Sequence, residues 1–290
     1  MKMSMTTNIR RTLSILFKEF IYGGHFQSLG AAGIAYIASS LLNIQFTWDC
    51  FLVVYMIFYP LYLFNRYKEL DLDESTNPDR TQHFRRYDNF MPIILLGVIL
   101  FVVVIVAVHS NLLTFVFSVA LLIFGLLYTV LFKSVTKKVV VFKDLYVSAF
   151  FSLLIFFPIF YYQEQLDNLL LLKAIVLFIF VYIKAFVMQV FLDVKDIESD
   201  RKEKLRTIPV LVGKGKTIRY LQMFDLGISL LFSIAIVPLI GALGWVFALA
   251  TPVLVFCYSL VKRDEYYGYV LRSGEFLSWF FVMILLKLVN

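Results

Sequence analysis

The sequence predicts an all-α, polytopic membrane protein whose helices surround a central cavity. Of its 290 residues, 61% are hydrophobic and 16% are charged, whereas a soluble domain of this size carries about 25% charged residues. Apolar stretches of about 20 residues, long enough to cross a bilayer core of ~30 Å, recur along the whole chain. Its 2 cysteines and 3 histidines provide neither a disulfide framework nor the ligand spacing of a zinc or haem site.

The N-terminal segment is predicted to be an amphipathic helix. Apolar residues share one face of it, with basic residues among them, as the positions Ile9, Leu13, Leu16, Phe17 and Phe20 show. This pattern is typical of a helix that lies in the membrane interface. The start of an ordinary packed helix would give the same pattern, so both interpretations stay open. We see no apolar segment followed by a cleavage site, and therefore expect no signal peptide.

The apolar stretches predict about nine membrane-spanning helices by the length criterion, near residues 28–45, 48–65, 90–108, 111–132, 144–162, 168–192, 220–238, 240–261 and 270–288. All but three of the 27 Lys and Arg residues lie in the N-terminal segment or in 66–89, 133–143, 195–219 and 262–272. This asymmetry predicts that those segments and the N-terminus face the cytoplasm. The net charge of +7 thus reports topology, and we expect no nucleic-acid partner. No linker divides the chain, so residues 1–290 are interpreted as a single domain.

The first dense cluster of charge is "NRYKELDLDESTNPDR", residues 65–80, which directly follows an apolar helix. If that helix continues, Asn65, Glu69 and Asp73 are spaced i, i+4, i+8 and share one face. Asp71 lies on the opposite side and is interpreted as a solvated residue. The acidic face continues inward through Tyr62.

A second cluster, "DVKDIESDRKEKLRTIPVLVG", begins at residue 193. Asp193, Asp196 and Asp200 are spaced i, i+3, i+7, which again predicts one face of one helix. Gln189, Phe186 and Tyr182 continue this face into the membrane.

Two carboxylate stripes at the same side of a membrane require an explanation, because like charges on one helix face repel each other and acids near the end of a span are costly. Either water solvates them or a cation bridges them. Hard oxygen ligands suit Mg²⁺, which usually takes one or two carboxylates and completes its shell with water and phosphate oxygens. The predicted magnesium ligands are Asn65, Glu69, Asp73, Asp193, Asp196 and Asp200.

These two segments resemble the motifs of the UbiA-type intramembrane prenyltransferase family. The first family motif has an Asn, acids four and eight residues later, and an Asn-Pro-x-Arg ending, which here is Asn77-Pro78-Asp79-Arg80. The second has a D-x-x-D-x-x-x-D stripe followed by a basic residue, Thr, an apolar residue and Pro, and soon afterwards Gly. Here the latter part is supplied by Arg206, Thr207, Pro209 and Gly213.

The chain departs from the family pattern in the first motif. Arg66 stands where the family usually has Asp, and Glu69 replaces the commoner Asp. Glutamate is one methylene longer and still binds Mg²⁺, so this replacement should change geometry more than chemistry. Arg66 lies about 100° from the Asn65 face of an ideal helix and is interpreted as a surface base.

The resemblance implies Mg²⁺-dependent transfer of an isoprenyl chain from a polyprenyl diphosphate to an acceptor, usually aromatic, within the membrane. Mg²⁺ held between the two acidic stripes would neutralise the charge that develops on the leaving diphosphate, and basic side chains would complete its binding site. The residues expected to act in catalysis are Asp73, Asp193, Asp196 and Lys133, and those expected to bind diphosphate are Arg80, Lys133, Lys143 and Arg206. Each of these bases could instead be a plain topological anchor.

The isoprenyl tail needs a dry, aromatic groove. The residues predicted to line it are Tyr62, Tyr128, Tyr182, Phe186 and Gln189. Lys184 lies about 13 Å deeper than Asp193 along a helix and roughly opposite the acidic face, so it needs a partner or water. An interhelical contact with Asp225 or Glu275 is the favoured interpretation over an acceptor pocket.

Other functions remain open at the level of sequence. A UbiA-type terpene cyclase or a transferase to a lipid acceptor would use the same diphosphate motifs. A transporter could use the acids as a cation site, but transporter sites lie near the bilayer midplane at broken helices, whereas these acids lie at helix ends. The residues do not identify the acceptor, the donor length or the oligomeric state.

Overall fold

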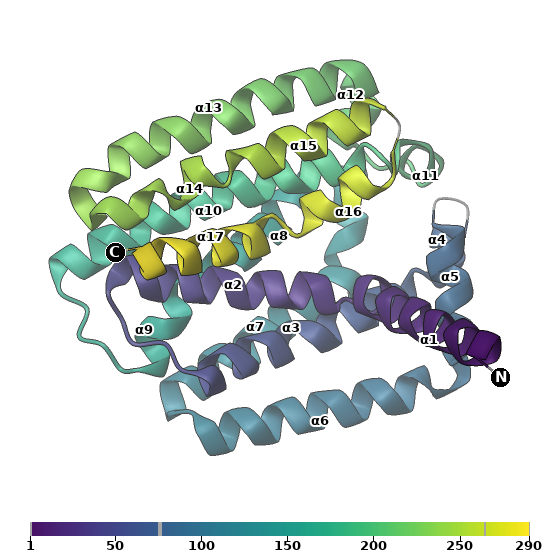
Figure 1. Cartoon of the computed structure of the whole chain (residues 1–290), viewed down its shortest axis with the longest axis horizontal. Helices are drawn as coiled ribbons and strands as arrows, with labels where there is room; N and C mark the ends of the chain where they lie inside the picture. The colour runs from purple at the N-terminus through teal and green to yellow at the C-terminus, as the bar shows by residue number, and fades with distance from the viewer. Residues whose placement is uncertain (1, 75–76, 264, 290) are drawn as a thin grey trace.

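The computed structural model describes residues 2–74, 77–263 and 265–289. The side chains of residues 2–11, 72, 73, 133 and 134 are outside this description, and the predicted site residues Asp73 and Lys133 are among them. Every described element is a helix, either α or 3₁₀ (η) (Figure 1). In chain order they are α1 (Lys2–Tyr22), α2 (His25–Leu42), α3 (Trp48–Lys68), α4 (Leu70–Asp73), α5 (Pro78–Phe84), η1 (Asp88–Phe90), α6 (Met91–His109), α7 (Leu112–Val130), η2 (Phe132–Lys137), α8 (Phe142–Ser152), η3 (Leu153–Phe156), α9 (Phe157–Tyr161), α10 (Asn168–Asp193), α11 (Ile197–Lys202), α12 (Ile208–Val212), α13 (Lys214–Ile240), η4 (Ala242–Trp245), α14 (Val246–Leu249), α15 (Thr251–Lys262), α16 (Tyr267–Ser273) and α17 (Glu275–Val289).

The predicted polytopic membrane fold is confirmed. Among the described residues, 7 helical segments are long and apolar enough to cross a membrane: Trp48–Lys68, Asp88–His109, Leu112–Val130, Phe142–Tyr161, Asn168–Asp193, Lys214–Ile240 and Ala242–Lys262. The pair α16 and α17, bent by 60° at Gly274, makes up to 8 if it is one span. The chain is therefore a multi-pass integral membrane protein.

The remaining predicted span, 28–45, corresponds to α2, which is a helix but lies outside this set. It packs between α3 and α17 and is buried on most of its surface. Small residues allow this close packing: a Cβ added at Gly33 would lie 2.9 Å from the backbone oxygen of Phe276. Because α2 meets protein rather than lipid, it can be less apolar than the outer helices.

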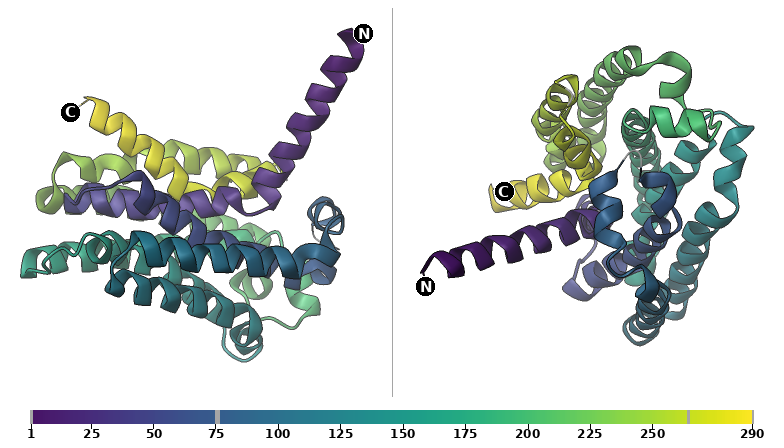
Figure 2. Two further views of the ribbon diagram at one scale, coloured as in Figure 1. Left: turned by 90° about the horizontal axis from the view of Figure 1, so that it is seen from below. Right: turned by 90° about the vertical axis from the view of Figure 1, so that its right-hand side faces the viewer.

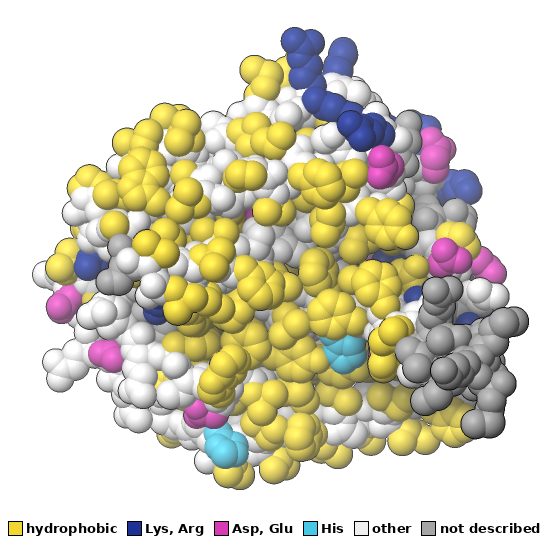
Figure 3. Space-filling model, viewed as in Figure 1, with side chains coloured by type: hydrophobic (Ala, Val, Ile, Leu, Met, Phe, Trp, Pro, Cys, Tyr) yellow, Lys and Arg dark blue, Asp and Glu magenta, His cyan; other side chains and the backbone are white. Residues whose placement is uncertain are grey.

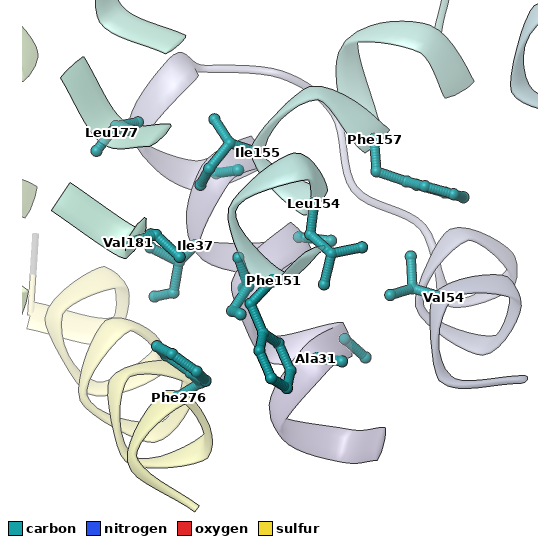
Figure 4. Packing of buried hydrophobic residues seen from close by; sticks show 14 of the residues in the cluster. Ala31, Ile37, Val54, Phe151, Leu154, Ile155, Phe157, Leu177, Val181 and Phe276 are labelled. Atoms are coloured by element: carbon teal, nitrogen blue, oxygen red, sulfur yellow. The ribbon is translucent and has the colours of Figure 1, made fainter. Parts of the chain in front are cut away.

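The outer helices present apolar side chains to the membrane. On α6, Ile93 is 71% exposed and Val104 58% exposed. Apolar side chains cover most of the face seen in Figure 3, and the charged side chains gather at its edges. Inside the bundle, side chains from α2, α8 and α17 meet in one core, where the rings of Phe151 and Phe276 lie 5.6 Å apart (Figure 4).

The polar segments collect at one end of the bundle. The short helices α4, α5 and α11 lie at the right of Figure 1 and α12 lies at its upper right, at the end of the bundle where α3 and α10 end. Helix α1 projects away from the bundle at this same end (Figure 2), and its Leu13, Leu16 and Phe17 are each 59% exposed. That exposed apolar face fits a helix in the membrane interface, which stays a prediction.

Neither acidic segment forms the continuous helix that its spacing predicted. Helix α3 ends at Lys68, with Glu69 as its C-terminal cap, and α4 begins at Leu70. Helix α10 ends at Asp193, and a turn precedes α11, whose N-terminal cap is Asp196. These breaks correct the prediction, and they release the acidic side chains from a shared helix face, where their charges would repel.

Candidate active site

The two acidic segments meet at one cavity of about 270 Å³. Side chains from the ends of α3 and α10 line its charged end, and α2, α7, α8 and α16 contribute further walls. The predicted metal ligands that line it are Asn65, Glu69, Asp193, Asp196 and Asp200. The predicted diphosphate ligands Arg80 and Lys143 line it as well, as do the predicted wall residues Tyr62, Tyr128 and Gln189. The structure thus brings together residues more than a hundred positions apart in the sequence.

In the first segment, hydrogen bonds orient Asn65 and Glu69 toward each other. Asn65 Nδ2 donates to Glu69 Oε2 at 2.9 Å, and Asn65 Oδ1 accepts from Thr129 Oγ1 at 3.2 Å. The backbone N–H of Glu69 donates to the carbonyl of Asn65 at 3.1 Å, which closes the last turn of α3. The amide of Asn65 is therefore held between α3 and α7.

In the second segment, each aspartate has a distinct neighbour. Asp193 Oδ1 accepts from Lys143 Nζ of α8, and its Oδ2 is buried with no hydrogen-bond partner among the described residues. Asp196 forms an ion pair with Lys195 at 3.2 Å. Asp200 Oδ2 accepts from the buried Thr207 hydroxyl at 3.0 Å. The threonine of the second motif thus orients the third acid of the stripe.

Burial changes the proton affinity of the groups beyond the helix ends. It raises the pKa of Asp200 to about 6, because the carboxylate loses solvation when it is charged. Burial also lowers the pKa of Lys195, and the neighbouring Asp196 carboxylate opposes that shift. Both shifts reflect charged groups held in a partly dry site.

Basic side chains surround the acids at the charged end of the cavity. Lys143, Arg80, Lys195 and Arg66 all line it, and Arg80 is only 6% exposed. Four cations beside five acids from the described lining give a site suited to a ligand that carries both phosphate oxygens and a metal ion.

The inner part of the cavity is aromatic and uncharged. Phe58, Phe150 and Phe151 line it, with ring centroids 4.7 Å apart for Phe58 and Phe150 and 5.6 Å apart for Phe58 and Phe151. Aromatic rings close the wall between α7 and α8: the ring of Tyr146 stacks on Phe124 with centroids 4.1 Å apart, and it lies 5.6 Å from the ring of Tyr128. Such a surface suits an apolar chain.

Some predicted site residues are not part of this cavity. Tyr182 and Phe186 line a separate, entirely apolar groove between α10 and α13, so their prediction as walls of this cavity is wrong. The face of α10 that lines the cavity is centred between Gln189 and Leu192. The face centred on Asp193, from which Tyr182 and Phe186 were predicted, is turned away from it by most of a quarter turn. Arg206 is exposed and also does not line the cavity.

Other lining residues were missed by the sequence analysis. Arg66, interpreted as a surface base, lines the cavity and has a buried Nε. Lys195 lines it because the turn after α10 redirects the chain. Gln27 and Ser273 line it from α2 and α16, and no motif marks them. For Arg66 and Lys195 a signal existed, since each lies within one of the two motifs.

The donor set fits a magnesium ion. No group of three or more His, Cys, Asp or Glu in the described part of the chain is arranged to hold a metal by itself. Magnesium binds through one or two carboxylates and completes its shell with water and phosphate oxygens, so it does not need such a group. The buried, unpartnered Oδ2 of Asp193 is the kind of oxygen it would use.

The deep lysine has the interhelical partners that the sequence suggested. Lys184 pairs with Asp225 of α13 and, at 2.8 Å, with Glu275 of α17. Arg272 of α16 pairs with the same two carboxylates. All four side chains are 0% exposed, and none of them lines the cavity. This cluster, Lys184–Asp225–Arg272–Glu275, therefore joins helices rather than forming the acceptor pocket.

Comparison with known proteins identifies the family. The chain matches the model of the UbiA prenyltransferase family over residues 28–285. The apo structure of a UbiA homolog from Aeropyrum pernix K1 superposes with a TM-score of 0.68 and 15% identity, covering 90% of this chain and 98% of that chain. A structure of digeranylgeranylglyceryl phosphate synthase superposes with a TM-score of 0.54 and 16% identity, covering 95% and 98%. No curated protein matches the sequence.

The low identities to the two solved structures show a shared fold. The family match, which covers most of the chain, shows more: the chain belongs to the UbiA prenyltransferase family, whose members are enzymes that transfer alkyl groups other than methyl.

Proposed function

We propose that the protein transfers an isoprenyl chain from a polyprenyl diphosphate to an acceptor inside the membrane, with Mg²⁺ as its cofactor. The observation that carries this proposal is the convergence of two acidic segments and four basic side chains on one cavity with an aromatic interior. A diphosphate would lie at the charged end, and its chain would extend inward between the rings.

Magnesium, when bound, would neutralise the charge that develops on the leaving diphosphate. Requirement for this ion is general in the family. The residues that would hold it are Asn65 and Glu69 from the first segment and Asp193, Asp196 and Asp200 from the second, with Asp73 as a further candidate. Their hydrogen bonds to Thr129 and Thr207 would keep the oxygens in place.

The basic side chains would bind the diphosphate oxygens directly. Arg80, Lys143, Lys195 and Arg66 line the same end of the cavity as the acids. Hydrogen bonds between charged groups are shorter and stronger than neutral ones, so these donors would also favour the transition state, in which the leaving group gains charge. Lys133 remains a candidate from its sequence position alone.

The aromatic interior would shield the reacting carbon. An allylic cation forms as the bond to the diphosphate breaks, and aromatic faces attract cations. Tyr62, Tyr128 and Phe58 line the cavity next to the charged end. Because these side chains exclude water, the cation would be captured by the acceptor rather than hydrolysed.

The acceptor is proposed to be aromatic, as is usual in the family. A lipid acceptor is the second candidate, favoured by the likeness to digeranylgeranylglyceryl phosphate synthase. A terpene cyclase would share the diphosphate site and would need no acceptor. We further propose that the charged end of the bundle faces the cytoplasm, as the distribution of Lys and Arg suggests.

The test is the release of diphosphate by the purified protein with geranyl, farnesyl, geranylgeranyl and longer donors, with and without Mg²⁺. Release that needs both Mg²⁺ and an acceptor supports the transferase, and the mass of the product identifies the acceptor. Mg²⁺-dependent release without an acceptor indicates a cyclase. No release by folded protein under any of these conditions contradicts the proposal and favours a transporter.

A further inference from the structure

The side chain of Gln27 is a polar group in the cavity wall that has no role in the proposed reaction. Gln27 of α2 lines the cavity. Its Nε2 donates to Ser273 Oγ of α16 at 3.4 Å, whereas its Oε1 is buried and has no hydrogen-bond partner among the described residues. A buried carbonyl oxygen without a donor is destabilising, so a donor from outside the protein is expected at this point.

The position of Gln27 along α2 places this residue at the level of the aromatic part of the cavity. A Cβ added at Gly24 would lie 2.6 Å from Tyr62 Cβ, and α2 and α3 run in opposite directions from there (Figure 1). Gln27 is therefore level with Phe58, which is about 10 Å from Asn65 along α3. An isoprenyl chain alone would bury this oxygen against hydrocarbon, which is costly.

Gln27 and Ser273 lie where α2 packs closely against the bend between α16 and α17. Gly274 follows Ser273 at the bend between α16 and α17, and a Cβ at Gly274 would lie 2.1 Å from Phe26 Cζ. On the other side of this bend, the buried Arg272 is tied to Asp225 and Glu275. The Gln27–Ser273 pair is thus fixed by contacts on both sides, as a binding site requires.

Gln27 lies outside the segments that supply the charged lining of the cavity. The charged side chains that line the described cavity belong to the motif regions and to the start of α8, namely Arg66, Glu69, Arg80, Lys143, Asp193, Lys195, Asp196, Asp200 and Glu203. The polar lining outside those regions includes the neutral Gln27, Gln189, Tyr269 and Ser273, and Ser273 is the hydrogen-bond partner of Gln27. A carboxylate or phosphate placed here would lose its hydration without gaining a cation, and an ammonium group would lack an anion.

We propose that Gln27, with Ser273 and Gln189, forms the binding site for the acceptor, and that the acceptor is an uncharged molecule with a hydroxyl group. This rests on the proposed function. The hydroxyl donates its hydrogen to Gln27 Oε1, and its lone pairs accept from an amide N–H such as that of Gln189. The rest of the acceptor, either a phenolic ring or an aliphatic chain, packs against the aromatic wall.

The transfer step then balances without a further reactant. The bond between C1 of the isoprenyl chain and the diphosphate oxygen breaks, and its electron pair leaves with the diphosphate. The hydroxyl oxygen, or a ring carbon that this oxygen activates, gives an electron pair to C1. The proton that the acceptor loses goes to the released diphosphate. Gln27 positions the hydroxyl and is not itself changed.

The test uses the purified full chain in detergent with Mg²⁺ and farnesyl thiolodiphosphate, a donor analogue that reacts very slowly. Acceptor binding is measured by calorimetry with two matched pairs of probes. One pair is 4-hydroxybenzyl alcohol and 4-hydroxybenzoate, and the other is a hexadecylglycerol and its phosphate. The variants are Gln27→Leu, Gln27→Met and, as a control with an exposed side chain outside the cavity, Gln45→Leu.

We expect the neutral member of at least one pair to bind more tightly than its anionic counterpart. Both Gln27 variants should weaken that binding about tenfold or more, since they remove a hydrogen-bond acceptor from a dry site. The Gln27 variants should bind the donor analogue as tightly as the original protein does. Gln45→Leu should bind both the donor analogue and the acceptor probes with unchanged affinity. The pair that binds distinguishes a phenolic acceptor from a lipid alcohol.

Three results would overturn the proposal. They are tighter binding of the anionic probes, no binding of any probe, and neutral-probe affinity in both Gln27 variants within twofold of the original protein. Failure of the proposed function gives a different result. In that case neutral probes bind in a Gln27-dependent manner, while no donor releases diphosphate in the presence of Mg²⁺.

Discussion

Lys143 of α8 and Asp193 at the end of α10 form an ion pair, and both side chains line the cavity. The pair uses one carboxylate oxygen of Asp193 and leaves Oδ2 buried without a hydrogen-bond partner in the described part of the chain. Lys143 therefore supports the charge of Asp193, and Asp144 lies beside the same carboxylate. The second oxygen is the atom that the proposed Mg²⁺ would contact. In the proposed site, Asp193 would therefore contact both the metal and Lys143, a proposed ligand of the diphosphate.

The variant Asp193→Asn should lose turnover and remain folded. Removal of an outer-shell partner of a bound metal costs about 10- to 100-fold, so loss of a direct ligand should exceed about 100-fold. Lys143 keeps the neighbouring Asp144 and Asp200 carboxylates, and the fold should survive. The measurements are diphosphate release and thermal unfolding in detergent.

Asp71→Asn is the matched control for this experiment. The Asp71 side chain is 91% exposed and pairs with Arg85 at 3.3 Å, and an exposed pair of this kind contributes about 0–1 kcal/mol. This variant should keep its activity and stability. Full activity in Asp193→Asn would remove the proposed metal site.

Glu69→Asp should keep substantial activity, within about tenfold of the original protein, which corresponds to about 1.4 kcal/mol. The replacement restores the residue commoner in the family and keeps a carboxylate beside Asn65, whose Nδ2 now donates to Glu69 at 2.9 Å. Turnover at saturating Mg²⁺ and the Mg²⁺ concentration for half-maximal rate are the quantities to measure. A folded but wholly inactive Glu69→Asp protein would show that the first segment has been assigned incorrectly.

Magnesium binding should depend on pH through Asp200. Burial raises the pKa of this carboxyl to about 6, above the value near 3.9 of an unfolded chain. Between about pH 4 and pH 6 the Asp200 carboxyl is protonated in the folded protein and ionised in the unfolded chain. The contribution of Asp200 to the free energy of unfolding is therefore fully present at low pH and is lost as the pH rises through 6. Because Mg²⁺ needs the ionised carboxylate, its affinity should rise over the same range.

Thermal unfolding at pH 5 to 8, with and without Mg²⁺, checks this dependence. The metal-free protein should melt at lower temperature above pH 6, and added Mg²⁺ should restore its stability there but have little effect at pH 5. Asp200→Asn should flatten the part of the pH dependence that this group causes. A Mg²⁺ effect equal at pH 5 and pH 8 would contradict the role of Asp200.

The chemistry of the charged end was predictable because it depends on short-range patterns. Asn65, Glu69, Asp193, Asp196 and Asp200 lie in two compact motifs, and residue type with spacing is sufficient to suggest a shared ligand. The structure adds that both helices break within the motifs. Those breaks depend on how the acidic turns pack at the end of the bundle, and the spacing alone predicted unbroken helices.

The interior of the site was not predictable by the same route. Tyr182 and Phe186 share the ideal helical face of Asp193, but the direction of the cavity is set by the helices that surround α10. Gln27 and Ser273 are separated by 246 positions, and only the packing of α2 against the bend between α16 and α17 brings them together. Long-range packing of this kind has no local signal in one sequence.

The buried cluster Lys184–Asp225–Arg272–Glu275 gives a prediction about stability. It contains two cations and two anions, all 0% exposed, and Asp225 also accepts from Tyr258 at 3.1 Å. In Asp225→Asn, two cations share the one remaining carboxylate. Loss of one partner from a buried ion pair costs about 3–5 kcal/mol, so the unfolding temperature should fall markedly.

The double variant Lys184→Met/Asp225→Asn restores the balance of charge in the cluster. It should therefore be more stable than Asp225→Asn alone, because no unpaired charge remains buried. The control is Glu198→Gln, which breaks an exposed pair with Arg201 at 3.0 Å and should change stability by no more than about 1 kcal/mol. Thermal unfolding of the original protein, Lys184→Met, Asp225→Asn, the double variant and Glu198→Gln in one detergent gives the comparison. If the two single-site losses simply add in the double variant, the residues are not coupled, and the cluster does not act as a unit that holds α16 against the cavity.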